Sequence, residues 1–226
     1  MKIAKGALYA VLTGDIVRSS RMAGADRRAL PGLLRRISRD VRRALPGKVP
    51  LDASVYRGDG WQLLLTDPAA SLRAALLFRA MVIAAAAGGS RSDTRIAIGL
   101  GGIDFVDNER ISEGDGEAYR LSGQALDAMR EPHRMTLVRS TTDTANHGAL
   151  VQLLDALVQE WTPFQARAVV GRIQGLTQAK IAGLWPEPIA QPSVAKHLER
   201  ARWPFVEGAL QTFEADLAHE QPSPAP

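Results

Sequence analysis

The stretch "SVYRGDGWQLLL", Ser54–Leu65, decides the fold of the N-terminal half of the chain. Strand-forming residues run up to Arg57 and resume at Trp61, with the tripeptide Gly58-Asp59-Gly60 between them, which predicts a tight hairpin joining two strands. Glycine tolerates a positive φ and aspartate accepts one better than most residues, so turn chemistry alone can explain a carboxylate at the tip. The rest of the sequence decides whether this carboxylate also has a function.

The composition is that of an ordinary globular protein. The chain has 226 residues, of which 46% are hydrophobic and 23% charged, and it contains no cysteine, which excludes disulfides, thiolate metal sites and cysteine nucleophiles. The four histidines are scattered without a metal-ligand spacing. The longest apolar run, "AALLFRAMVIAAAA", is too short to span a bilayer, and "MKIAKGALYAVLTGD" lacks the cleavage pattern of a signal peptide. We therefore expect a cytoplasmic protein with no membrane partner.

Periodicity predicts elements in the order βαββαβαβ over the first part of the chain. The expected elements are a buried strand at about 7–16, a helix at 26–45, hairpin strands at about 52–57 and 60–66, a helix at about 68–87, a strand at 94–105, a helix at 116–129 and a strand at 134–140. A hairpin within alternating strands and helices indicates an α+β fold, a mixed sheet covered by helices of the ferredoxin-like βαββαβ type.

The remainder of the chain is helical in pattern, broken at "WTP" and "WPEPIAQP". We therefore expect an α+β domain at 1–142, an all-α domain at 143–218 and a flexible tail at 219–226. The two parts differ in charge, because residues 1–142 carry 22 Lys and Arg against 15 Asp and Glu, and residues 143–226 carry 6 against 9. The net negative charge of the second part argues against nucleic-acid binding there unless its basic residues are clustered on one surface.

The predicted helix at 26–45 has an arginine-rich face opposite its apolar one. The arginines are Arg28, Arg35, Arg36, Arg39, Arg42 and Arg43. Such a face either meets phosphates or is solvated, and the sequence assigns it no function.

Two carboxylates are expected to meet at one edge of the sheet. Asp15 ends the first strand in "TGDIVRSS", and Asp59 stands on the hairpin tip. If the first strand lies beside the hairpin, these side chains and the backbone carbonyl of Ile16 offer hard oxygen ligands that suit Mg²⁺ bridging phosphates. Backbone N–H groups and hydroxyls at Ser19 and Ser20 suit the phosphates. Alternatively, the same residues are turn and cap residues without a ligand.

Four segments carry a resemblance to a known family: "DIVRSS", "YRGDGWQLLL", "RIAIGLGG" and "GEAYRLSGQALDAM", in this order. They resemble the class III nucleotidyl cyclase fold, whose members have an Asp-Ile strand end, a Gly-Asp hairpin and an Arg-Ile-Gly-Ile strand. The diguanylate cyclase fold is a more distant relative of this pattern. With the helical part included, residues of about 7–215 resemble the SatD-like family of bacterial proteins.

The resemblance implies a site for a nucleotide with Mg²⁺. Asp15 and Asp59 match the two metal-binding aspartates of the cyclases, with Ile16 beside the first. The positions implied for nucleotide contacts are Arg18, Ser19, Ser20, Gly58 and Arg120.

The chain also departs from the cyclase pattern. Arg120 and Gln124 stand where the cyclases carry an Asn and an Arg that stabilise the transition state, Val55 replaces a base-selecting lysine, and Arg18 replaces a glycine in the phosphate loop. Losing such charge stabilisers typically costs orders of magnitude in rate. The departures therefore favour a nucleotide sensor over an enzyme.

The segment "GLTQAKIAGLWPEPIAQPSVAKHLERARW" has the layout of a helix-turn-helix. Its second helix is expected to begin at Gln191 with a capped first turn. The residues expected to face DNA are Gln191, Ser193, Lys196, His197 and Arg200. The long turn and the acidic balance of this part leave a packing or dimerisation domain as the alternative.

Taken together, these features indicate a homodimeric, DNA-binding transcriptional regulator whose N-terminal domain is a degenerate, nucleotide-sensing relative of the cyclases. Two alternatives remain, an active Mg²⁺-dependent nucleotide cyclase and a protein-interaction module without a ligand.

Overall fold

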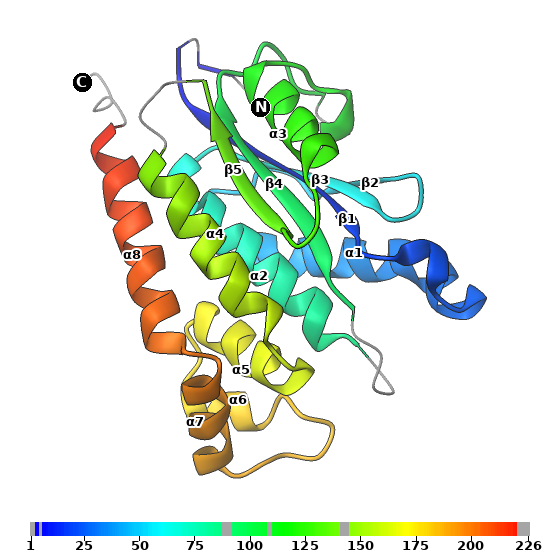
Figure 1. Ribbon diagram of the computed structural model, residues 1–226, viewed down its shortest axis with the longest axis vertical. Helices are drawn as coiled ribbons and strands as arrows, with labels where there is room; N and C mark the ends of the chain where they lie inside the picture. Colours follow the sequence, from blue (N-terminus) through cyan, green and yellow to red (C-terminus); the bar gives the residue numbers. More distant parts are fainter. Residues whose placement is uncertain (1–2, 5, 87–91, 108–109, 141–144, 221–226) are drawn as a thin grey trace.

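A computed structural model gives one five-stranded mixed sheet with helices packed on both of its faces and further helices extending to one side (Figure 1). The structure describes residues 3–4, 6–86, 92–107, 110–140 and 145–220. Its first part comprises β1 (Tyr9–Ile16), α1 (Gly24–Ala44), β2 (Ser54–Tyr56), β3 (Gly60–Leu65), α2 (Ser71–Ala84), β4 (Thr94–Gly101), α3 (Glu117–Ala128) and β5 (Met135–Arg139). The expected α+β class and element order are confirmed. Within the described ranges no helix is long and apolar enough to cross a membrane.

The sheet has the strand order β2-β3-β1-β4-β5. β1 is antiparallel to both of its neighbours, β3 and β4, and β5 is parallel to β4. Because β3 lies between β1 and β2, α1 connects two strands that are not neighbours, and the hairpin inserts its second strand between them. β1 is therefore the central strand, and seven of its eight residues are buried.

The two faces of the sheet pack against different helices. Leu12 of β1 and Leu63 of β3 lie in the cluster that α1 and α2 cover, whereas Val11 and Leu64 lie in the cluster on the α3 side. The alternation follows from the two-residue period of a strand. α3 approaches β4 so closely that a Cβ atom on Gly99 would lie 2.4 Å from the carbonyl oxygen of Ala118, so only glycine fits there.

Trp61, in the stretch that predicts the hairpin, anchors that hairpin to the core. Its ring is fully buried and stacks on Phe78 of α2 with 3.7 Å between ring centroids, and its indole N–H donates to the hydroxyl of Thr94 at 3.1 Å. A Cβ atom on Gly14 would lie 2.5 Å from this ring, so β1 carries a glycine beneath it. The indole therefore joins β3, β1, β4 and α2.

The hairpin forms, but its turn is shifted by one residue from the sequence-based expectation. Gly60 pairs with Tyr56 within the ladder, so the connecting residues are Arg57, Gly58 and Asp59. The positive φ angles belong to Arg57 (52°) and Gly58 (89°), and Asp59 has none. The conformational tolerance of aspartate therefore does not explain the carboxylate at the tip.

The second part of the chain is helical, as expected. It comprises α4 (Ala145–Gln159), α5 (Pro163–Ile173), α6 (Gln178–Ala182), α7 (Gln191–Arg200) and α8 (Trp203–Glu220). The break at Trp161–Pro163 is present, and Thr162 forms a capping box with Gln165 at the start of α5. The expected domain boundary at 142 and the tail segment 221–226 lie outside the described residues, and α8 continues through 219 and 220.

The helical part shares one hydrophobic core with the sheet. α2 has ten apolar or charged side chains buried along its length besides Ser71, because α1 and the sheet cover part of its surface and α5 covers another part. Val151 and Leu154 of α4 and Val169 of α5 belong to the same cluster as Leu76 of α2. This explains why the apolar residues of α2 show no single helical stripe.

A charged group lies at the centre of this shared core. Arg79 of α2 is 0% exposed; its Nε and Nη2 atoms each donate to Asp93 at 2.8 Å, and its Nη1 donates to Asp155 of α4 at 2.6 Å. Asp155 also accepts the backbone N–H of Arg134, just before β5, at 2.7 Å. The network joins α2, the start of β4, the start of β5 and α4.

Candidate functional site

Asp15 and Asp59 lie at the same edge of the sheet. In the antiparallel pairing of β1 with β3, Asp15 stands opposite Gly60, the residue that follows Asp59. The hairpin therefore brings its tip beside the end of β1, and Ile16 follows as the last, buried residue of that strand. Ser19 comes from the short turn after β1 and donates its hydroxyl hydrogen to Asp59.

Each of the two carboxylates already has a protein partner. Arg95 of β4, directly opposite Asp15 in the ladder, donates from Nε to one carboxylate oxygen at 2.9 Å and from Nη2 to the other. The hydrogen bond to Asp15 raises the pKa of the Arg95 guanidinium. As arranged, the pair does not fit a divalent cation, because Arg95 occupies both oxygens of Asp15. No group of three or more potential ligands arranged for a metal occurs among the described residues.

Tyr56 completes this edge of the sheet. A Cβ atom on Gly60 would lie 2.7 Å from its ring, so the ring lies across the hairpin backbone. Burial raises the pKa of the Tyr56 hydroxyl, and the negative charge of Asp15 raises it further. Neither Tyr56 nor Arg95 was expected from the sequence, although Arg95 stands in the segment "RIAIGLGG" at a position that pairs with the end of β1.

The turn after β1 differs from a phosphate loop that leads directly into a long helix. Arg18 has a φ of 57°, a three-residue 3₁₀ turn follows at Ser19–Arg21, and α1 begins only at Gly24. Ser20 is exposed, and the Arg18 guanidinium lies 3.9 Å from Glu131. Gly58, on the hairpin, has no atom within 4 Å of a Cβ position, so it leaves open space beside the tip.

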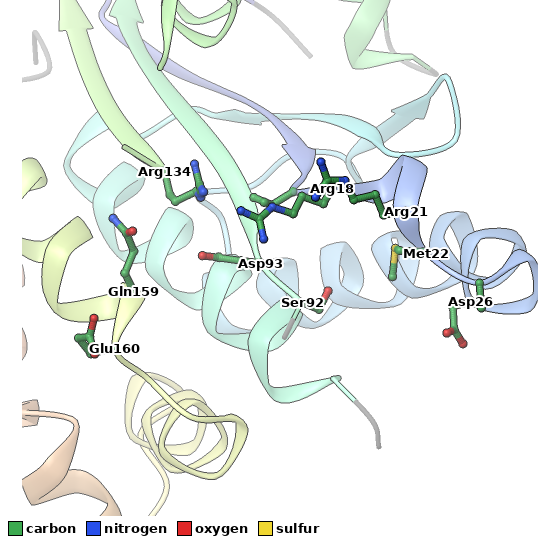
Figure 2. A pocket seen from close by; sticks show the side chains of 11 residues that line it. Arg18, Arg21, Met22, Asp26, Ser92, Asp93, Arg134, Gln159 and Glu160 are labelled. Atoms are coloured by element: carbon green, nitrogen blue, oxygen red, sulfur yellow. The ribbon is translucent and has the colours of Figure 1, made fainter. Parts of the chain in front are cut away.

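A hollow of about 500 Å³ lies beside this turn, between the end of β1 and the end of α4 (Figure 2). We call it the Arg18 hollow; it is lined by Val17, Arg18, Arg21, Met22, Ala23, Asp26, Ser92, Asp93, Arg134, Gln159 and Glu160. In Figure 2, Gln159 and Glu160 come from the end of α4, Met22 and Asp26 lie on the opposite side, and Arg18 and Asp93 lie between. The hollow thus has walls from both the sheet and the helical part.

Arg120 lies near the opposite ends of the strands from Asp15 and Asp59. The backbone N–H of Ala118, in the first turn of α3, donates to the carbonyl of Gly102, beyond the end of β4. Arg95, which pairs with Asp15, stands at the beginning of β4, so about 20 Å of strand separates the two ends. Arg120 instead binds Asp115 at 2.9 Å. The structure therefore brings Ser19 to Asp59 but does not bring Arg120 to either aspartate.

α6 and α7 form a compact helix pair on α5. Ile181 of α6 and Val194 of α7 are fully buried, and Leu198 is 6% exposed. Gly171 of α5 allows α6 to approach, because a Cβ atom there would lie 2.5 Å from Ile181. Residues 183–190 connect the two helices, and Ile189 is tied back by its N–H, which donates to the carbonyl of Ala182. The long connection is thus part of the packed unit.

The start of α7 differs from the expected cap. Ala190 is the N-cap residue and provides no side-chain hydrogen bond, whereas Pro192 does lie in the first turn, as expected. The side-chain amide of Gln191 donates to Gln178 at the beginning of α6, at 3.5 Å. By contrast, the hydroxyl of Thr177 caps α6 by accepting the N–H of Lys180.

The polar face of α7 has exposed and half-buried members. Gln191, Lys196 and Arg200 are exposed, and Ser193 and His197 are half-buried. The imidazole of His197 stacks on Trp185, with 5.8 Å between ring centroids and 18° between planes. Burial lowers the pKa of His197, and the positive charge of Arg200 lowers it further.

Comparison with protein-family models and with curated proteins gives no match for this chain. The arrangement at the sheet edge and the α6–α7 pair are therefore interpreted from their own chemistry.

The lowered pKa of His197 predicts a pH dependence of stability. In the unfolded chain this imidazole takes up a proton near its ordinary pKa of about 6.5, whereas in the folded protein it does so only at lower pH. The contribution of neutral His197 to the free energy of unfolding is therefore fully present above the pKa of the unfolded chain. It is lost as the pH falls through the lower pKa of the folded protein. Urea midpoints measured across this range should therefore fall more steeply for the unmodified protein than for His197→Gln. A titration by nuclear magnetic resonance that places the pKa of His197 at or above its ordinary value would contradict this.

Proposed function

We propose that this protein is a DNA-binding transcriptional regulator whose α6–α7 pair contacts DNA and whose α+β part senses a nucleotide. The observation that carries the proposal is that α7 is held by one face only. Val194 and Leu198 pack on the neighbouring helices, while Gln191, Lys196 and Arg200 stay exposed on a helix of ten residues. Such a helix is about 15 Å long and fits the major groove.

The distribution of charge supports this use of α7. All six Lys and Arg of residues 143–226 lie between 163 and 202, and only two of the nine Asp and Glu do, namely Glu187 and Glu199. The other seven acidic residues lie at sequence positions 143–160 and 207–220. The acidic balance of the helical part therefore does not describe residues 163–202, which contain the helix pair and whose excess of positive charge suits a phosphate backbone.

The exposed residues have different expected roles. Lys196 and Arg200 carry the charges that suit phosphate contacts, and the Gln191 amide, at the start of α7, has the donor and acceptor needed to read a base edge. His197, packed on Trp185, supports the shape of the helix pair instead. A homodimer would place two copies of α7 on two half-sites and so raise the affinity of a module with few contacts.

The proposed nucleotide-sensing role rests on the turn after β1. Arg18 and Arg21 line the Arg18 hollow beside Ser19 and the hairpin, and the volume of about 500 Å³ lies within the range of small-molecule sites. This is consistent with the resemblance to nucleotidyl cyclases and to the SatD-like family. Catalysis is not proposed, because Arg120 and Gln124 stand at the positions of the two transition-state groups and Arg120 is bound to Asp115 at the far edge of the sheet.

A protein-interaction role is the second candidate, and one observation favours it. Among the described residues, five large hydrophobic side chains are exposed, and four of these lie in the helical part, namely Leu153, Phe164, Leu184 and Phe205. Phe205 is 71% exposed at the beginning of α8. Such exposed apolar side chains would suit contact with a second copy of the chain, which is compatible with DNA binding by a dimer.

DNA binding by α7 predicts two kinds of mutant. Lys196→Ala and Arg200→Ala should weaken binding to all duplexes and reduce the slope of log K against log salt by about one unit each, because each removes a phosphate contact. Gln191→Ala should instead reduce the preference among sequences, by roughly 1–3 kcal/mol at one base pair. Arg43→Ala, which removes the same charge from α1, serves as the control.

The measurement is genomic fragment selection followed by titration of the selected duplexes at several salt concentrations. Equal losses in Lys196→Ala and Arg43→Ala would mean that overall charge, and not α7, governs binding. Failure to retain any fragment at moderate salt would leave the protein-interaction role.

The nucleotide proposal predicts that Arg95 prevents Mg²⁺ from affecting nucleotide binding. Because Arg95 occupies Asp15, Mg²⁺ should change the nucleotide affinity of the unmodified protein little. Arg95→Gln frees both oxygens and should make binding Mg²⁺-dependent, and Arg18→Gln should weaken it about tenfold with or without the metal. Calorimetry with a series of nucleotides checks this, with Arg27→Gln as the charge-matched control. A strong Mg²⁺ dependence in the unmodified protein that Asp15→Asn removes would favour the cyclase alternative.

A further inference from the structure

Four arginines of α1 form a stripe along the side of the helix that faces away from the core. Arg28, Arg35, Arg39 and Arg42 follow one another at intervals of seven, four and three residues, which places them within about 60° of one another around the helix axis. The buried residues Leu30, Leu34, Ile37 and Val41 occupy the opposite side. All four arginines of the stripe are exposed.

Part of this stripe forms one wall of a second hollow of about 500 Å³. The other walls are residues 51–55, leading into β2, and the turn after Arg110; we call this the Arg39 hollow. Arg35, Arg39 and Arg42 line it together with Arg110, so the lining carries four guanidinium groups and one carboxylate, Asp52. It shares no lining residue with the Arg18 hollow.

The charges of this hollow are only partly compensated. Within the described ranges Arg35 and Arg39 have no ion-pair partner. Arg42 lies 3.6 Å from Asp52, and both side chains are nearly half exposed. Exposed pairs of this kind contribute little to stability, so a stronger anion can replace the carboxylate as the partner of Arg42. Arg110, on the other wall, lies 2.8 Å from Glu113 in a second exposed pair. Among the described residues, the lining charges without an ion-pair partner are therefore those of Arg35 and Arg39, which repel each other unless an anion lies beside them.

Hydroxyl groups add donors at the same place. Ser54 accepts the backbone N–H of Ser112 at 3.2 Å, which leaves the hydrogen of its hydroxyl free to donate. Both serines line the hollow. Guanidinium groups together with hydroxyls are the donors that bind the oxygens of phosphate groups in proteins.

We propose that the Arg39 hollow binds a compact anion with two or more phosphate groups. Because the arginines come from two separate segments, an anion with several phosphate groups can contact α1 and Arg110 at once. Duplex DNA is a different occupant, because a long regular backbone would lie along the whole stripe and would contact Arg28 as much as Arg39. The inference does not depend on whether α7 binds DNA or on whether the Arg18 hollow binds a nucleotide.

The test is calorimetric titration of the full chain with inorganic pyrophosphate and with tripolyphosphate, which carry no base or sugar. We expect saturable binding that Arg39→Gln weakens about tenfold or more and that Arg35→Gln weakens similarly, since each removes a charge-assisted contact. Arg28→Gln, which removes the same charge from the same stripe outside the hollow, should change the affinity less than twofold. All three side chains are exposed, and unchanged circular dichroism will show that the variants are folded.

Several results would overturn the proposal. No saturable binding of either compound at millimolar concentration would do so, as would equal losses in Arg28→Gln and Arg39→Gln, which indicate a diffuse charge effect. Loss of binding in Arg18→Gln but not in Arg39→Gln would place the anion in the Arg18 hollow. Tight binding of duplex DNA that Arg39→Gln weakens, without any binding of the two small anions, would assign the stripe to nucleic acid instead.

Discussion

The buried guanidinium of Arg79 constrains the arrangement of the whole molecule. Removing this group from water is costly, and the cost is offset only because two carboxylates surround it with charge-assisted hydrogen bonds from three of its nitrogens. Asp93 directly precedes β4, and Asp155 lies in α4. Any displacement of α4 from α2 would leave an unpaired charge in the core, so the network holds the helical part in one position against the sheet.

The candidate sites lie around this fixed centre. Asp93 and Arg134 line the Arg18 hollow, and both take part in the network through the side chain of the first and the backbone N–H of the second. The end of α4 forms the facing wall and leads into α5, on which α6 and α7 pack. A ligand in this hollow would contact the residues that connect the sheet to the proposed DNA-binding helices, while the Arg39 hollow lies on a different part of the surface.

Sequence patterns predicted the elements well, because each depends on residues close together in the chain. The alternation around Gly58, the helical spacing of Leu30 and Leu34 and the proline-rich break before α7 all lie within a few turns. The ion-pair partners of buried and half-buried charged residues depend on how distant segments of the chain align, and local sequence patterns do not give this alignment. Arg95 neutralises Asp15 across 80 residues, and Arg79 meets Asp155 across 76.

The sequence predicted that the two aspartates lie close together but not which protein groups bind them. The sequence placed Asp15 and Asp59 at one sheet edge, yet it contained no local signal that Arg95 would occupy the first or that Ser19 would donate to the second. The sequence also did not indicate that Arg120 lies far from the two aspartates. Arg120 was included because of the resemblance, which does not specify that the first turn of α3 lies at the end of β4, away from Asp15. Likewise, the half-buried state of His197 depends on Trp185, which lies in the connection between the two helices.

The shared core around Arg79 implies that the sheet and the helices α4–α8 unfold together. Native-state hydrogen exchange measures this directly, because it gives a free energy of opening for individual amides. If the two parts are one cooperative unit, the slowest amides of β1 and β4 and those of α4 and α5 will report the same free energy, and Asp155→Asn will lower both by the same amount. A clearly lower free energy for α4 and α5, with the sheet unaffected by Asp155→Asn, would show two independent domains and contradict this account.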